Sequence, residues 1–217
     1  MDDARVYEAR LEVLDFLVEV FHDAPGEAFL ERLFSEAVTV PEGGINEPID
    51  SGFERLDAFV EANRSRPVEA VADELRTEYT RLFVGPRPPA LPHETHFRED
   101  TDFIGEGVAE LEADYAAAGW TPREDYPEEN DHLAVELAFL RDLVDRQRRG
   151  EAAAFDYERV FIDEHLTRWC GAFLETLRAE LDEPDADAGA SLFLAAAEVF
   201  VGLVEFEDEL VAQQVPT

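Results

Sequence analysis

The sequence predicts an all-α protein, a single domain of about eight to ten helices over residues 1–217. Through most of the chain, apolar residues recur at three- and four-residue spacings, which is the period of an amphipathic helix. No stretch of convincing length alternates between apolar and polar residues, as a half-buried strand would. Proline, glycine and asparagine interrupt the periodic segments, and the early connections are short, as in helix bundles.

Four helices are predicted in the first part of the chain. They are Tyr7–Phe21, Glu27–Val38, a third with its apolar stripe over Phe53–Val60, and Val68–Phe83. Their ends are marked by the sequences DAPG, VPEGGINEP and SRP. Asp50 or Ser51 is expected to cap the third helix, and Ser65 the fourth, because short polar side chains accept hydrogen bonds from free backbone amides.

Four further helices are predicted at Phe103–Ala118, Asp131–Arg149, Tyr157–Leu181 and Leu192–Val211. Gly119 suits a left-handed helix cap, and the arginines of the Asp131 helix gather in its last turn, where the helix dipole favours cations. We expect the Tyr157 helix to be broken near His165.

Residues 84–100 form a proline-rich hinge loop in this prediction. Helix and central strand are implausible here because proline lacks an amide donor and fixes its backbone. The segment contains Gly85, Pro86, Pro88, Pro89 and Pro92.

The charge is strongly acidic: 52 acidic residues face 18 basic ones, the formal net charge is -34, and every basic residue apart from histidine is arginine. One interpretation is a functional acidic surface that attracts cationic partners and repels nucleic acid and anionic membrane. The other is adaptation to molar salt, where charges are screened over about 3 Å. The acids are spread over every predicted helix, which favours the second interpretation and a halophilic archaeal source.

The chain is expected to act in the cytoplasm. Its amino terminus lacks the basic start and apolar core of a secretory signal, and the apolar run LFLAAAEVFVGLV is interrupted by Glu198 and too short to span a bilayer. Cys170 is the single cysteine, so an internal disulfide and a multi-cysteine metal site are excluded.

Common catalytic motifs are absent. The sequence has no GxGxxG, no Walker pattern and no GxSxG elbow. HETH at residues 93–96 and ENDH at residues 129–132 have spacings seen in metal sites, but a di-iron bundle needs two Glu-x-x-His pairs and two further glutamates. We therefore predict no metal, no cofactor and no catalytic residue.

Asp131 and His132 allow two interpretations. They can start a helix, with Asn130 or Asp131 satisfying free amides and His132 pairing with Glu136 one turn later. Alternatively, an acceptor beside a switchable donor can bind a peptide amide or a guanidinium group. The residues alone leave both open.

Aromatic residues bracket the two unusual loops. Such residues are ordinarily core, but beside stiff proline-rich loops they can also line a rigid groove for a peptide. They are Phe83, Phe97, Phe103, Trp120 and Tyr126.

Three segments occur in the order EYTRLFVGPRPPALPHETHF, ENDHLAVELAFLRDL and FIDEHLTRWCGAFLETL. The first is similar to a Tyr-x-x-Leu-Phe-x-Gly-Pro opening, the second to an Asp-His helix start, and the third to a His-Leu-x-x-Trp helix. Together, over about Leu75 to Leu210, they resemble the TorD/DmsD/NarJ family of cytosolic chaperones for molybdenum-containing redox enzymes.

The resemblance implies an all-helical chaperone without catalytic chemistry. Its partner is expected to be the catalytic subunit of a molybdopterin oxidoreductase of the DMSO/TMAO reductase type, bound through its twin-arginine signal peptide, its apo form or both, until the cofactor is inserted. Monomers or domain-swapped dimers are expected. Alternatives are a nitrate-reductase assembly chaperone of the same family and, in another class, a metal-dependent helical hydrolase or weak nucleotide hydrolase using Asp131, His132 and Glu129.

Residues carried over from the family motifs give the predicted peptide-binding set: Asp131, His132, Phe83, Gly85, Pro86, His93, Glu94, Thr95, Phe97 and Trp120, the last added from its place beside a loop. Tyr79 and Leu82 also match the loop opening, whereas His165, Leu166 and Trp169 match the third motif and are expected to pack.

Four positions depart from the family pattern. His93 replaces a common tryptophan, Thr95 a serine, Phe97 a tyrosine and Glu129 a proline. Threonine and phenylalanine preserve most of the chemistry, whereas His93 and Glu129 do not, so we expect them to alter which peptide the loop prefers.

Overall fold

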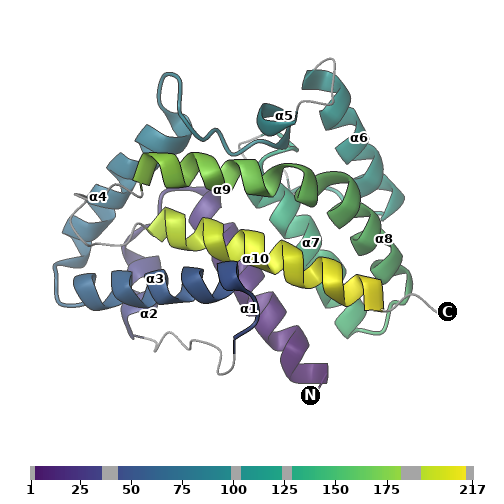
Figure 1. The fold of residues 1–217 in the computed structure, drawn as a ribbon, viewed down its shortest axis with the longest axis horizontal. Coiled ribbons are helices and arrows are strands. Elements are labelled where there is room, and N and C mark those ends of the chain that lie inside the picture. The colour runs from purple at the N-terminus through teal and green to yellow at the C-terminus, as the bar shows by residue number, and fades with distance from the viewer. Residues whose placement is uncertain (1–2, 36–43, 99–103, 124–128, 182–191, 214–217) are drawn as a thin grey trace. The chain divides into compact units, whose positions relative to one another are not determined.

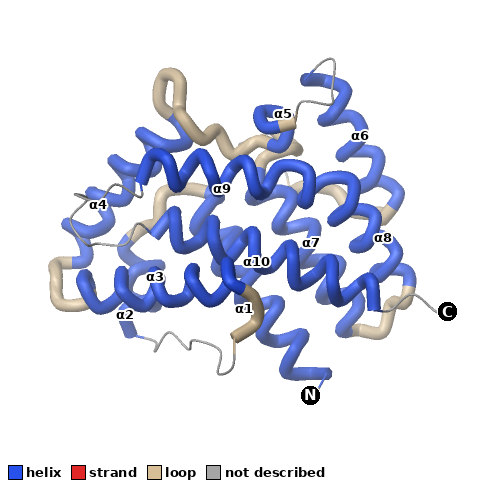
Figure 2. Tube along the Cα trace, in the orientation of Figure 1, coloured by secondary structure: helices blue, strands red, loops and turns tan. Residues whose placement is uncertain are grey.

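The computed structural model describes residues 3–35, 44–98, 104–123, 129–181 and 192–213. Over these ranges every regular element is helical (Figure 2). His93 and His132 form an isolated antiparallel bridge. The all-α fold class is therefore confirmed. The elements, shown in Figure 1, are α1 (Asp3–His22), α2 (Glu27–Ser35), α3 (Glu47–Asn63), α4 (Val68–Tyr79), η1 (Thr80–Val84), α5 (Glu94–Phe97), α6 (Ile104–Ala117), α7 (Leu133–Arg148), α8 (Ala153–Phe161), η2 (Ile162–Leu166), α9 (Thr167–Leu181) and α10 (Leu192–Gln213).

Two compact units are formed by the chain. The first unit comprises residues 1–22, 92–169 and 207–217, and the second comprises residues 23–91 and 170–206. Helices α9 and α10 each contribute to both units. The hinge loop also contributes to both, since its residues up to Leu91 belong to the second unit and those from Pro92 to the first. A single domain over 1–217 stays a prediction.

In the second unit, α3 lies very close to α10. A Cβ atom on Gly202 would lie 2.5 Å from the Ile49 backbone nitrogen, and one on Gly52 would lie 2.6 Å from the Val199 side chain. Glycine is therefore required at both positions, because any side chain would force the two backbones apart.

The predicted caps of α3 and α4 were wrong. Asn46 caps α3: its Oδ1 accepts from the Ile49 amide at 3.0 Å, and its Nδ2 donates to the Gly202 carbonyl at 2.8 Å. The helix begins earlier than expected because proline suits its first turn. Asp50 instead accepts from the Ile45 amide. Helix α4 follows Pro67 without a side-chain cap.

The helix from α8 to α9 has a wide π turn, η2, at Ile162–Leu166. The expected break near His165 is thus a change of helical pitch, without an end to the helix. A π turn inserts one extra residue and so changes the direction in which nearby side chains point. A second π turn, η1, ends at the hinge loop, where the Gly85 amide donates to the Thr80 carbonyl at 2.6 Å.

Buried polar groups join four helices of the first unit. The Arg10 guanidinium of α1 donates to Glu207 of α10 at 2.8 Å, to Glu158 of α8 at 2.8 Å and to Gln147 of α7 at 3.2 Å. All four side chains are buried. One cation therefore serves two carboxyl groups, which requires a proton on one of them to avoid an uncompensated buried charge.

Glu158→Gln is expected to reduce the pH dependence of stability. Burial, followed by the charge of Glu207, raises the pKa of Glu158 to about 8. The folded protein then keeps a proton that the unfolded chain loses above about pH 4.5, so the free energy of unfolding falls as the pH rises toward about 8. The slope of one such group is up to about 1.4 kcal/mol per pH unit.

Denaturant unfolding in molar salt between about pH 5 and about pH 8 measures this slope. Glu209→Gln, an exposed position on the same α10 that carries Glu207, is the control for general charge effects. If the free energy of unfolding had the same pH slope in Glu158→Gln and Glu209→Gln, the extra proton would not belong to the buried carboxyl groups around Arg10.

Candidate functional site

The hinge loop and the start of α7 are hydrogen-bonded to each other in the first unit. The Leu133 amide donates to the Pro92 carbonyl at 2.8 Å, and the Glu94 amide donates to the Asp131 carbonyl at 3.0 Å. His93 and His132 lie opposite one another in the isolated bridge. Segments nearly 40 residues apart thus form one site, as expected if the two motifs act together.

The Asp131 carboxylate holds the loop in place. Its Oδ1 lies 2.9 Å from His93 Nδ1, and its Oδ2 accepts from the Thr95 hydroxyl at 2.5 Å and from the Thr95 amide at 3.4 Å. Only 1% of the residue is exposed. Burial alone would raise the pKa of Asp131, but the hydrogen bonds from His93 and Thr95 outweigh it and lower the pKa. Asp131 is therefore ionised at neutral pH.

His132 is the cap of α7. Its Nδ1 accepts from the Ala134 amide at 3.1 Å, so the ring supplies the acceptor that was expected from Asn130 or Asp131. Burial, followed by the charge of His93, lowers the pKa of His132 to about 3 and keeps the ring neutral. The helix-start interpretation is thus correct in location and wrong in the residue that caps.

The rings of His93 and His132 meet edge to face, with centroids 5.1 Å apart. A neutral His132 can lie against His93 without charge repulsion. Because the ring of His93 donates to the ionised Asp131, the residue that departs from the family pattern is part of the loop's attachment.

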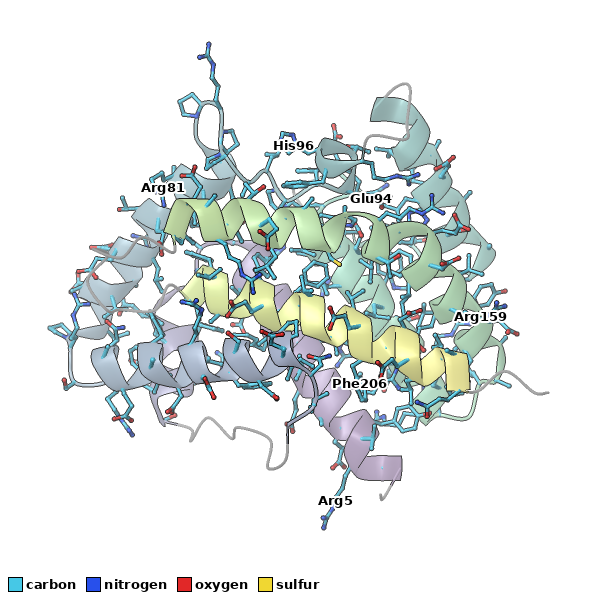
Figure 3. The ribbon with its side chains drawn as sticks, in the orientation of Figure 1. Arg5, Arg81, Glu94, His96, Arg159 and Phe206 are labelled. Carbon is cyan, nitrogen blue, oxygen red and sulfur yellow. The ribbon has the colours of Figure 1, made fainter. Side chains whose placement is uncertain are left out.

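Glu94 ties α5 to η2 and has no exposed surface. Its two carboxylate oxygens each lie 3.0 Å from His165 Nδ1, and one accepts from Arg98 at 2.7 Å. His165 Nε2 lies 3.0 Å from Asp114 Oδ2 of α6. In Figure 3, Glu94 and the exposed His96 are labelled on α5. The short helix is thus held through the inward-facing Glu94.

The third motif also reaches the site. The ring of Phe97 stacks on Trp169, with centroids 5.8 Å apart and planes 21° apart. His165, Leu166 and Trp169 are all buried, as packing residues would be. The Trp169 indole donates to Glu136 Oε2 at 3.2 Å, so Glu136 bonds to the third motif and not to His132 as the helix-start interpretation expected.

Glu136 is a buried acid without a cation bonded to it among the described residues. Its Oε1 has no hydrogen-bond partner there. Burial, followed by the charges of Glu94 and Asp131, raises the pKa of Glu136 well above its usual value. Burial among these carboxylates therefore favours the protonated form of the Glu136 side chain.

The remaining predicted residues lie in different surroundings. Trp120, half buried in the first unit, contacts the rings of Tyr115 at 4.9 Å and Phe139 at 5.2 Å. Phe83 belongs to the second unit and is buried against Tyr79 and Phe193.

Gly85 and Pro86 follow η1 in the second unit, and Pro86 is exposed. Phe103 and Tyr126 lie outside the described residues. Peptide contacts by the predicted set, and a groove made by Phe83, Phe97 and Trp120, stay predictions.

Three partners in the site were not among the predicted residues. Arg98 is four residues from Glu94, a spacing that indicates an ion pair on one helix face. No sequence spacing indicates the contacts of Asp114 and Glu136, because each bonds to a helix distant in sequence.

Within the described ranges, no group of three or more His, Cys, Asp or Glu residues could hold a metal ion. No helix of the described chain is long and apolar enough to cross a membrane.

The fold and this site define a class: an all-helical protein in which a proline-rich loop is bound to an Asp-His helix start and a His-Leu-x-x-Trp helix. Residues 44–175 match the family described as nitrate reductase delta subunit. The chain belongs to this family.

Curated relatives include proteins named chaperone protein TorD. The one from Vibrio cholerae serotype O1 is 26% identical over 175 residues, covering 77% of this chain and 79% of the relative. The relative from Vibrio parahaemolyticus is 28% identical over 184 residues, which cover 81% of this chain and 85% of the relative. The relative from Photobacterium profundum is 26% identical over 155 residues, which cover 65% of this chain and 69% of the relative. No solved structure matches significantly. The resemblance to TorD-type chaperones seen in the sequence is confirmed.

Asp131→Ala is expected to lower the free energy of unfolding by about 1–3 kcal/mol, because it leaves the donors of His93 and Thr95 without their buried acceptor. The effect should be concentrated in the loop, so amide exchange of residues 94–98 should accelerate more than that of α7. Denaturant unfolding and hydrogen exchange measure the two effects.

Asp156→Ala on the exposed face of α8 is the matched control. If Asp131→Ala left both the stability and the exchange of residues 94–98 at the control values, Asp131 would not be the anchor of the loop.

Proposed function

We propose that the protein is a maturation chaperone that binds the twin-arginine signal peptide, the apo form or both, of a molybdopterin oxidoreductase of the DMSO/TMAO reductase type, and assists cofactor insertion before export. Membership of the nitrate reductase delta subunit family and similarity to chaperones named TorD support this function. The protein acts in the cytoplasm in this proposal, as a monomer or a domain-swapped dimer, and has no catalytic role and no cofactor of its own.

The observation that carries the proposal is the attachment of the loop to the Asp-His helix start. Thr95 and His93 bond to Asp131, and the loop backbone bonds to the backbone on both sides of His132. A rigid loop loses little entropy when a peptide orders against it. The attachment therefore supports a peptide-binding surface built from the proline-rich loop and the Asp-His helix start.

In the proposed mechanism, the apolar part of the signal peptide lies near Phe83, Phe97 and Trp120, and acidic residues receive its arginines. Only 1% of Asp131 is exposed, and it bonds to Thr95 and His93, so a guanidinium group can reach it only if these loop contacts open. The net charge of -34 attracts a dibasic peptide from a distance. In molar salt this attraction is screened, and apolar contacts then carry most of the affinity.

A nitrate-reductase assembly chaperone is the second candidate, favoured by the match of residues 44–175 to the nitrate reductase delta subunit family. In that case the client would be a nitrate reductase subunit without a conventional signal peptide. The enzyme alternative, a hydrolase using Asp131, His132 and Glu129, is tested by metal analysis of protein purified without added ions. Stoichiometric iron, zinc or manganese would favour the hydrolase.

Capture of the client is the first test. A pull-down at high salt from the native cytosol, with the tagged protein as bait, is expected to recover a molybdoenzyme precursor that still carries its signal peptide. Recovery of a nitrate reductase subunit without such a signal would favour the second candidate, and recovery of no molybdoenzyme would contradict both.

Peptide binding is the second test. Asp131→Ala combined with His132→Ala is expected to weaken binding of a synthetic twin-arginine signal peptide about tenfold or more, with helicity retained in circular dichroism. Asp156→Ala is the control. Titrating salt upward should leave most of the parent's affinity; complete loss of binding at high salt would contradict the division between apolar and charged contacts.

A further inference from the structure

His165 lies in the π turn η2 with a carboxylate at each ring nitrogen. Nδ1 lies 3.0 Å from both oxygens of Glu94, and Nε2 lies 3.0 Å from Asp114 Oδ2. A carboxylate oxygen accepts and does not donate, so each ring nitrogen must carry a hydrogen for both bonds to form. The geometry thus indicates that His165 is an imidazolium cation. Only 2% of the residue is exposed.

Helix α5, which Glu94 begins, depends on this cation. Four residues are too few for a helix that is stable by itself, so contacts with other elements must fix it. Its inward contacts are the Glu94 bonds, the Thr95 bonds to Asp131 and the stacking of Phe97 on Trp169. Glu94 makes the connection to η2 and, through His165, to α6.

We propose that doubly protonated His165 is the positioning residue of α5, and that loss of its proton releases α5 and weakens capture of an apolar, arginine-containing peptide. The part concerning the peptide rests on the proposed function. The part concerning α5 does not, because it concerns only the protein itself.

Charged and titratable groups from each neighbouring element support this role. Arg98 of α5 bonds to Glu94 at 2.7 Å and lies 3.5 Å from Glu110 of α6. Without the His165 charge, the buried Glu94 keeps Arg98 as its cation and still repels the nearby carboxyl group of Glu136 when that group is ionised. The deprotonated ring can donate from one nitrogen only, so it would lose its bond to Glu94 or to Asp114.

The direction of the pH effect follows from the same contacts. Burial would lower the pKa of His165, but the hydrogen bonds and charges of Glu94 and Asp114 outweigh it and raise the pKa above 6.5. The stabilisation that protonated His165 gives the fold is therefore complete below about pH 6.5. It is lost as the pH rises through the higher pKa of His165 in the folded protein. His132 stays neutral throughout this range because its pKa is about 3.

Trp169 provides a reporter, because Phe97 of α5 stacks on its indole. The chain has two tryptophans, so Trp120→Phe leaves Trp169 alone. In this background we expect the Trp169 emission to change as the pH rises above about 6.5. The amide protection factors of residues 94–98, which correct for the intrinsic rise of exchange with pH, should fall over the same range. Far-UV circular dichroism should stay constant through the change.

Two variants assign the transition to His165. His165→Gln in the same background should abolish it. Asp114→Asn, at a half-buried position, should shift it to lower pH without unfolding the protein, because one of the two carboxylates loses its charge. Asp114→Asn keeps the test decisive if His165→Gln does not fold. Asp156→Asn on α8 is the control.

Glu136 is the competing group, because it bonds to Trp169 and also has a raised pKa. Glu136→Gln should leave the transition in place. A transition that persists in His165→Gln, or that does not move in Asp114→Asn, would overturn the proposal, as would one that disappears only in Glu136→Gln.

The peptide is then tested in parallel. A synthetic twin-arginine signal peptide should bind about tenfold more weakly above the transition than below it, and this difference should be lost in His165→Gln. A Trp169 transition without peptide binding at any pH would leave the role of His165 in α5 standing and contradict the proposed function. Unchanged peptide affinity across a clear transition would overturn the link between them.

Discussion

The carboxylate of Asp131 bonds the proline-rich loop to the first turn of α7, and the local geometry depends on this contact. Burying a carboxylate costs several kcal/mol unless donors replace its lost water. Here the donors come from His93 and Thr95 of the loop, so the charge and the loop stabilise each other. Prolines limit the other conformations available to the loop, which lowers the entropy that this attachment must overcome.

The polar contacts continue beyond Asp131 through the loop into α5 and on to η2. Thr95 bonds to Asp131, and the adjacent Glu94 bonds to His165. A buried polar network with nearly all partners present specifies one arrangement, because any shift leaves donors or acceptors unpaired. The π turn matters here, since it brings His165 between two carboxylates that belong to different helices.

Periodicity and helix-breaking residues were enough to predict most helices and the irregularity near His165. Caps were less predictable, since Asn46 and His132 cap helices where other polar residues were also available. The family motifs indicated Asp131 and His132, and in the loop His93 and Thr95, but not that these loop residues bond to Asp131. Which carboxylate meets His165 depends on the packing of helices distant in sequence, and an acidic chain offers many candidates for each position.

A surplus of acid also shapes the protein's interior. The chain has no lysine and 18 arginines for 52 acidic residues. Among the described residues, the buried Glu158 and Glu207 share the single cation of Arg10, and the buried Glu136 bonds to the indole of Trp169. Protons then take the place of cations, as the raised pKa values of Glu136 and Glu158 indicate. Salt screens exposed charges over a few ångströms but affects buried ones much less. Salt and pH therefore act on different parts of the molecule: salt on the acidic surface, and pH on the buried contacts that hold α5 and the helices around Arg10.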